Sequence, residues 1–158
     1  METKLPTLAH TIDEALERFN LISGAGNGET SACVMTAISW VAGEAWSDSP
    51  ECAHRLLRYM AVAANDHPAT TPEQRADLVR AGEHGLIDTW WIPDTVVLGC
   101  MAESRDEDPV TETLSTLALV AWWKVDKRRA NLSGADLSGA DHNGCTTWPA
   151  GFDKGRLA

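Results

Sequence analysis

The chain has 158 residues, of which 44% are hydrophobic and 23% charged, so it suits one globular domain with a single core and does not have the composition of a disordered chain. The formal net charge of −10 is uneven, with −12 on residues 1–123 and +2 on residues 124–158. An acidic body makes nucleic acid an unlikely partner, because phosphate contacts need Lys and Arg. No segment approaches the ~20 apolar residues that span a bilayer, and the N-terminus lacks a signal-peptide pattern. We therefore expect a cytoplasmic protein with no membrane partner.

The four cysteines are far apart and form no C-x-x-C pair; they are Cys33, Cys52, Cys100 and Cys145. This spacing is neither a zinc framework nor a dense disulfide scaffold. Free and mostly buried thiols are the simplest interpretation. The histidines give no metal-ligand spacing, so the sequence predicts no metal and no cofactor.

The first helix is predicted from a capping box, in which Thr11 precedes Glu14 by three residues. Apolar residues continue at helical spacing as far as Ile22, and Gly24 is expected to end this helix. The glycine-rich residues 23–29 favour a flexible connector over a phosphate-binding loop, because no strand and no P-loop lysine accompany them. A second helix should begin near residue 30 or 31 and stop at Gly43. It is apolar on more than one side, which predicts a central position.

A third helix is predicted to begin at Asp48 or Ser49 as its cap, with Pro50 in the first helical position. It should end before the turn at residues 65–68. A short fourth helix begins at the capping pattern of residues 71–74, and residues 82–93 are interpreted as a packed loop. A fifth helix is expected at about 94–102, and a sixth follows Pro109 and runs to about residue 129. The predicted fold class is mainly α, a bundle of five to six helices over residues 1–129.

Residues 130–158 change to a period of five, in Ala130-Asn131-Leu132-Ser133-Gly134 and the two units that follow. This tail resembles the pentapeptide-repeat family, whose units form the sides of a right-handed β-helix. The resemblance implies a short β-helical C-terminal tail packed on the helical domain, with Leu132 and Leu137 among its contacts. Two good units and a degenerate one do not close a coil, and an unclosed coil leaves open edges that a second copy could pair with.

The turn between the second and third helices is the densest polar cluster of the chain. Glu44, Asp48 and His54 could bind a metal or perform acid–base work, and Trp40 lies one helical turn before Glu44. These four residues are the candidates for a ligand site. The favoured interpretation is structural: Asp48 caps the third helix, and Glu44 pairs with an arginine such as Arg55 or Arg75.

Two tryptophan pairs could form an aromatic platform for a nucleobase or a protein. They are Trp90-Trp91 and Trp122-Trp123, and with Leu132 and Leu137 they are the candidate interface residues. Neighbouring residues on a helix point about 100° apart. One of Trp122 and Trp123 should therefore be buried and the other exposed.

Residues 33–66 resemble a set of small uncharacterised helical proteins of actinobacteria and their phages. The shared pattern is C-x-M-x-x-x-[AS]-[WY]-[LV]-A-G-E-x-x-S-D-x-P-x-C followed by an Asn-Asp pair, here from Cys33 to Cys52 and then Asn65-Asp66. Thr36 and Ser49 depart from it, standing where an acidic residue and a histidine are usual. The resemblance implies an origin, with the host cytoplasm as the location if a phage encodes the chain. It implies no activity.

We expect a non-catalytic binding protein that acts on a host or phage protein, or on a small metabolite in a cleft between the second and third helices. One alternative is a small helical metal-dependent hydrolase that uses Glu44, Asp48 and His54. Another is a self-assembling structural protein, a homo-oligomer formed through the tail.

Overall fold

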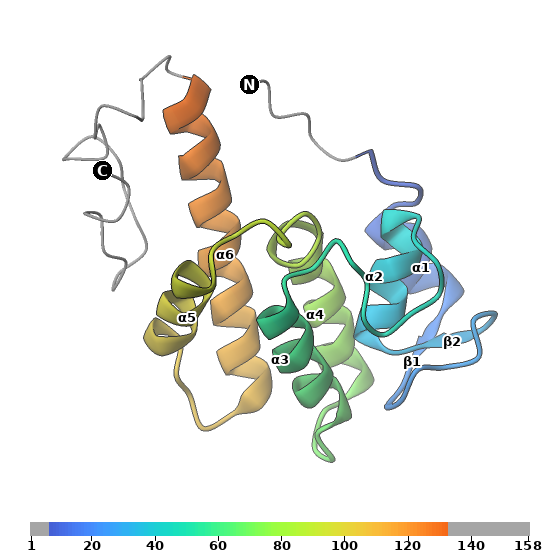
Figure 1. Ribbon diagram of the computed structural model, residues 1–158. Helices are drawn as coiled ribbons and strands as arrows, with labels where there is room; N and C mark the ends of the chain where they lie inside the picture. The colour runs from blue at the N-terminus through green and yellow to red at the C-terminus, as the bar shows by residue number, and fades with distance from the viewer. Residues whose placement is uncertain (1–6, 133–158) are drawn as a thin grey trace.

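The structure, a computed structural model, describes the backbone of residues 7–132 and the side chains of residues 7–127 (Figure 1). The described part is mainly helical. Its elements are α1 (Ile12–Arg18), β1 (Asn20–Leu21), β2 (Ser31–Ala32), α2 (Val34–Ala42), α3 (Arg55–Asp66), α4 (Pro72–Gly85), α5 (Asp94–Glu103) and α6 (Pro109–Leu132). Within residues 7–132, none of the helices is long and apolar enough to cross a membrane.

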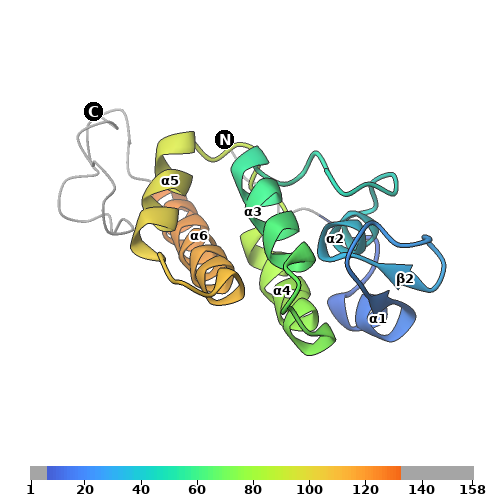
Figure 2. The same ribbon diagram turned by 90° about the horizontal axis from the view of Figure 1, so that it is seen from below.

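The helices lie side by side around one apolar core. Seen from below, α3 and α4 stand between α5 and α6 on one side and α1, α2 and the strands on the other (Figure 2). The core includes Ile38 of α2, Leu57 of α3, Leu78 of α4 and Leu117 of α6, all fully buried. Apart from Trp40 and Ala42, every residue of α2 is buried. The predicted central position of the second helix is therefore confirmed.

The predicted length of the first helix was wrong. The capping box of Thr11 and Glu14 is present, but α1 ends at Arg18 and Phe19 is already extended. Residues 20–21 instead form a short parallel ladder with residues 31–32. This pairing delays the second helix, which begins at Val34 rather than near residue 30. The side chain of Asn27 shapes the connecting loop, because its Oδ1 accepts hydrogen bonds from three successive backbone N–H groups, those of residues 29–31.

The predicted start of the third helix was also wrong. Neither Asp48 nor Ser49 caps α3; its N-cap is His54, whose Nδ1 accepts from the backbone N–H of Leu56 at 3.1 Å. Residues 43–54 form a long loop instead. A distant partner fixes its end, because the backbone N–H of His54 donates to Thr89 Oγ1 at 2.8 Å. At the other end Gly43 terminates α2 in the left-handed conformation, with φ of 77°, as predicted.

The fourth helix begins at its predicted capping box but is longer than expected. It runs to Gly85, because Gly82 and Gly85 are packing positions rather than helix breakers. A Cβ at Gly85 would lie 2.6 Å from the Cβ of Leu117, so α4 and α6 approach closely there. The predicted packed loop is thus confined to residues 86–93, where Leu86, Ile87 and Ile92 are buried.

The last two helices begin where they were predicted. The backbone of α6 continues to Leu132, so the first residues of the pentapeptide pattern, 130–132, are helical and not part of a β-helical coil. The proposed division at residue 129 between a helical domain and a tail stays a prediction. The remaining repeat units, including Leu137, lie outside the described residues, as does Cys145.

Candidate functional site

The 43–54 loop is held by the carboxylate of Glu44. Oε1 accepts a hydrogen bond from the backbone N–H of Glu51 at 2.7 Å, and Oε2 accepts one from the backbone N–H of Cys52 at 3.0 Å. The sequence favoured a structural role for an acidic side chain at this turn, and Glu44 has one. Its partners are backbone groups rather than Arg55 or Arg75, which bind Asp94 and the carbonyl of Asn65.

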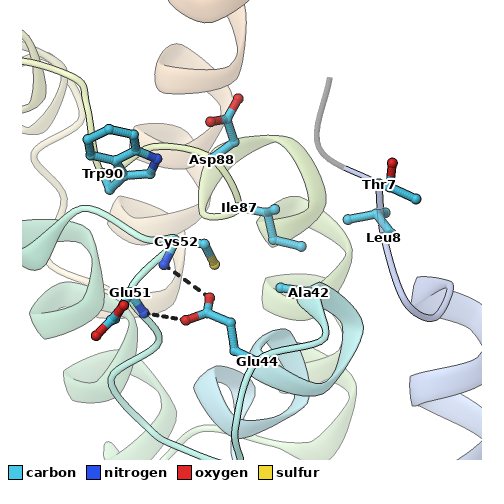
Figure 3. Close-up of a pocket in the computed structure, with 9 residues that line it drawn as sticks. All are labelled: Thr7, Leu8, Ala42, Glu44, Glu51, Cys52, Ile87, Asp88 and Trp90. Carbon is cyan, nitrogen blue, oxygen red and sulfur yellow. Dashed lines mark hydrogen bonds between the residues drawn. The ribbon is translucent and has the colours of Figure 1, made fainter. Parts of the chain in front are cut away.

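A cleft of about 510 Å³ opens beside Glu44. Figure 3 shows Glu44 and Cys52 from the 43–54 loop, Ile87, Asp88 and Trp90 from the loop after α4, and Thr7 and Leu8 from the N-terminal segment around this space. Glu51 and Ala42 complete the lining. We call this space the acidic cleft, because three of its nine lining residues carry carboxylates and none is basic. Its volume lies within the range of small-molecule sites.

The pKa of the Cys52 thiol reflects both its burial and the negative charge of Glu44 in the acidic cleft. Burial raises its pKa to about 12, helped by a hydrogen bond to the Glu44 carboxylate and by the negative charge of that group. The backbone N–H of Asp88 acts in the opposite direction but is outweighed. Cys52 therefore stays a neutral thiol at physiological pH. Among the described cysteines, all three are free: Cys33, Cys52 and Cys100.

Asp88 stands in a strained position on the cleft wall. Its φ is 59°, and among residues 7–132 it is the one non-glycine residue with a positive φ. An aspartate tolerates this left-handed conformation better than most residues, at a cost in stability. Contacts to Trp91 hold it there: the indole Nε1–H lies 3.0 Å from the Asp88 carbonyl and 3.1 Å from Oδ1. The backbone N–H of Trp90, two residues further on, donates to the Cys52 carbonyl at 3.2 Å, and the exposed Trp90 lines the cleft.

A second cleft of about 460 Å³ adjoins the first, and Glu51 and Trp90 line both. We call it the arginine cleft, because Arg55 and Arg58 are on its wall. His54 Nε2 lies 2.8 Å from Asp94 Oδ1, while Arg55 Nη2 lies 2.5 Å from Asp94 Oδ2. The hydrogen bond from Arg55 is the largest influence on the pKa of Asp94 and lowers it. Desolvation, the second largest, acts to raise this pKa, but the charge of Arg55 and the contact with His54 lower it further.

The structure does not bring the four predicted ligand residues together. Glu44 lines the acidic cleft and His54 the arginine cleft, whereas Asp48 is exposed and lines neither. Trp40 is half-buried and stacks on the ring of His10, with the ring centroids 3.6 Å apart. Within the part of the chain that the structure describes, no three His, Cys, Asp or Glu side chains are grouped so as to hold a metal ion.

The tryptophan pairs are each divided between core and surface. Trp123 is buried and Trp122 is 41% exposed, as helical geometry predicted. Trp91 packs on Trp123 with ring centroids 5.6 Å apart, while Trp90 is 65% exposed. Trp90 and Trp122 remain candidates for surface contacts, but Trp91 and Trp123 form a core contact instead. The side chains of Leu132 and Leu137 lie outside the described residues.

Several residues of the pattern in 33–66 make structural hydrogen bonds. Cys33 caps α2, with its Sγ accepting from the backbone N–H of Thr36 at 3.4 Å. Asn65 joins α3 to the start of α2: its Oδ1 accepts from the buried N–H of Val34, and its Nδ2 donates to the carbonyl of Ile22. Residues 65–66 were interpreted only as a turn, yet they lie at the end of α3 and hold two other segments in place.

Sequence reasoning missed most of the acidic cleft. The sequence predicts Glu51 in a helix and Asp88 in a packed loop, and it gives no signal for Leu8. No local pattern identifies them, because the cleft is assembled from three segments far apart in the chain. Comparison of the sequence and the structure with protein-family models, curated proteins and solved structures gave no match.

Proposed function

We propose that this chain is a non-catalytic binding protein that holds a small cationic ligand in the acidic cleft. The observation that carries the proposal is the cleft itself, which three acidic residues of two loops line together with the exposed Trp90, and whose volume is large enough for a metabolite. It lies beside the end of α2 and the loop that leads into α3, close to where a metabolite site was expected from the sequence.

The charges of the lining favour a positive ligand. Glu44, Glu51 and Asp88 contribute acidic side chains, and the nine described lining residues include no lysine, arginine or histidine. Opposite charges a few ångströms apart attract more strongly at such a partly buried site than in bulk water. The raised pKa of Cys52 agrees with this, since the charge of Glu44 contributes to it. A negative ligand would be repelled by the charge of Glu44 in the wall of the cleft.

The apolar part of the lining suits a ligand with a short hydrocarbon or planar portion. Leu8, Ala42 and Ile87 line the cleft together with the ring of Trp90. An indole attracts a guanidinium or ammonium group placed over its face, and tryptophan is the best aromatic residue for this contact. An amine or a guanidine on an alkyl chain therefore matches both the charge and the surface.

The same geometry gives little support to catalysis. Both oxygens of Glu44 accept backbone hydrogen bonds, and a thiol with a pKa of about 12 is a poor nucleophile at neutral pH. His54, the other candidate base, is engaged by Asp94 and by the backbone N–H of Leu56 in the neighbouring cleft. A nucleophile and a base within hydrogen-bond reach are the minimum for covalent catalysis, and the acidic cleft offers no such pair among its described residues.

Isothermal titration of the full chain with agmatine tests this function. Agmatine has a guanidinium and an ammonium on a four-carbon chain and carries no carboxylate. We expect saturable binding that weakens at least tenfold in Ala42→Leu, which fills the cleft from the end of α2. The matched control is Ala63→Leu, which adds the same bulk at an exposed position of α3. No binding, or equal binding by Ala42→Leu, would refute the proposal.

A further inference from the structure

We propose that the ligand also carries a carboxylate and spans both clefts, so that its basic group lies in the acidic cleft and its carboxylate binds Arg58 in the arginine cleft. The ligand class is then a basic amino acid, free or as the C-terminal residue of a peptide. This inference rests on the proposed function and names the chemistry of its ligand.

The two clefts are adjacent parts of one surface. They share Glu51 and Trp90, so a molecule that reaches past the Trp90 indole leaves the first cleft and enters the second. The linings differ in charge. The acidic cleft has carboxylates and no basic residue among its nine, whereas both arginines lie beyond Trp90. A ligand with a positive group at one end and a negative group at the other matches this arrangement of acidic and basic residues.

Arg58 is oriented for a carboxylate. Its Nη1 donates to the backbone carbonyls of Ser49 and Pro50 at 3.3 and 3.1 Å, and the side chain is half-buried. These bonds anchor one end of the guanidinium to the 43–54 loop. A guanidinium has further N–H donors on Nε and Nη2, which match the two oxygens of a carboxylate in a bidentate pair.

The acidic residues of the arginine cleft do not oppose a carboxylate as strongly as their number suggests. Asp94 has one oxygen within 2.8 Å of His54 and the other within 2.5 Å of Arg55, so its charge is compensated locally. Glu51 lies on the shared wall and also belongs to the acidic cleft. Of the two arginines in this cleft, Arg55 forms an ion pair with Asp94, whereas Arg58 forms none with a described carboxylate.

The test compares ligands that differ only by a carboxylate. L-Arginine is compared with agmatine, its decarboxylated form, and N-acetyl-Gly-Gly-Arg is compared with its C-terminal amide, all by isothermal titration against the full chain. We expect at least one carboxylate form to bind about tenfold more tightly than its partner, a difference of about 1.4 kcal/mol. The free amino acid and the peptide arms distinguish a metabolite from a protein C-terminus.

Two variants test whether Arg58 causes the preference for carboxylate ligands. Arg58→Lys keeps a donor for the loop carbonyls but loses the bidentate edge, and it should reduce the carboxylate preference to less than threefold while agmatine affinity is unchanged. Arg80→Gln, at an exposed position of α4 where Arg80 pairs with Asp77, is the control and should keep the full preference. Thermal unfolding of each variant confirms that it is folded.

Two outcomes would overturn the inference. If agmatine binds as tightly as L-arginine and the peptide amide as tightly as the acid, the ligand needs no carboxylate, although the proposed function stands. If the preference exists but survives in Arg58→Lys, the carboxylate is bound elsewhere. Absence of binding by all four ligands refutes this inference together with the cationic-ligand proposal.

Discussion

Replacing Glu44 by glutamine removes one of the two acceptors that hold the 43–54 loop. A glutamine keeps one carbonyl oxygen, but its amide nitrogen cannot accept the second backbone hydrogen bond. Bonds to a charged acceptor contribute more than neutral ones, but the bond from Glu51 is exposed and water can replace its acceptor. The bond from Cys52 is partly buried and dominates the loss. We therefore expect the free energy of unfolding to fall by about 1–2 kcal/mol.

The same substitution should make Cys52 more reactive. Burial, the largest cause of its raised pKa, remains, but the charge of Glu44 disappears and any hydrogen bond from the thiol is to a neutral amide, which is weaker. The pKa of the Cys52 thiol should then fall from about 12 while staying above its ordinary value of 9.0. Each unit by which the pKa falls gives tenfold more thiolate at a pH well below it. Alkylation of Cys52 by iodoacetamide at pH 8.5 should accelerate.

Both effects are measured on the full chain. Urea unfolding followed by tryptophan fluorescence gives the stability, and peptide-resolved mass spectrometry separates alkylation of Cys52 from that of the other cysteines. Glu51→Gln is the matched control, because it removes a charge from the same cleft while its backbone bond to Glu44 remains. We expect it to change the free energy of unfolding by less than ~0.5 kcal/mol. Equal stability of Glu44→Gln and Glu51→Gln would refute this account of the loop.

Three further predictions concern the packing and the loop connections. Asn65→Ala leaves the buried N–H of Val34 without its acceptor. Urea unfolding should therefore show that the free energy of unfolding falls by about 2 kcal/mol. A fall below ~0.5 kcal/mol would contradict the role of Asn65. Gly85→Ala places a Cβ 2.6 Å from that of Leu117. This overpacking should lower the free energy of unfolding by about 1–3 kcal/mol in the same assay. An unchanged free energy of unfolding would contradict the close approach of α4 and α6. Burial acts to raise the pKa of Asp66, but hydrogen bonds from the Gly24 backbone, Asn65 and Ser23 outweigh it and hold that pKa below the usual 3.8. A pKa lowered by folding means that ionised Asp66 stabilises the fold above the unfolded-state pKa, and that this stabilisation is lost as the pH falls through the folded-state pKa. Asp66→Asn should therefore unfold at lower urea than the wild type at pH 7, with a difference that shrinks below about pH 4; an undiminished difference at pH 3 would contradict the assignment.

Local signals predicted the features that local interactions decide. The capping boxes at Thr11 and Thr71 and the left-handed stop at Gly43 are present because each involves residues within four positions of one another. The start of α6 at Pro109 belongs to the same group. The division of Trp122 and Trp123 between surface and core also follows from helical geometry alone.

Contacts between residues far apart in the sequence determine the features of the fold that the sequence did not predict. The strand pairing that shortens α1 joins residues about eleven positions apart, across the loop shaped by Asn27. The start of α3 depends on Thr89, whose hydroxyl accepts from the backbone N–H of His54. An Asp-Ser-Pro sequence is a good helix start in isolation, but Glu44 binds the next two backbone N–H groups and keeps this segment in a loop.

For the same reason the sequence predicted only two of the nine residues that line the candidate site. Glu44 and Trp90 were identified, one as a ligand candidate and the other as an interface candidate, without any expectation that they share a cleft. Their meeting depends on the loop after α4, where Asp88 has a left-handed backbone and the next two backbone N–H groups donate to the carbonyl of Cys52. A strained aspartate leaves no recognisable trace in the residues around it.

The most direct test of the central claim is a ¹H–¹⁵N correlation spectrum of the full chain titrated with agmatine. Saturable shifts should be confined to the Trp90 indole N–H and to the backbone amides of Glu51, Cys52 and Asp88. The amides of α5 and of the loop at residues 23–29 should stay in place. Shifts that never saturate, or that centre on Trp122 or another surface, would contradict a cation site in the acidic cleft.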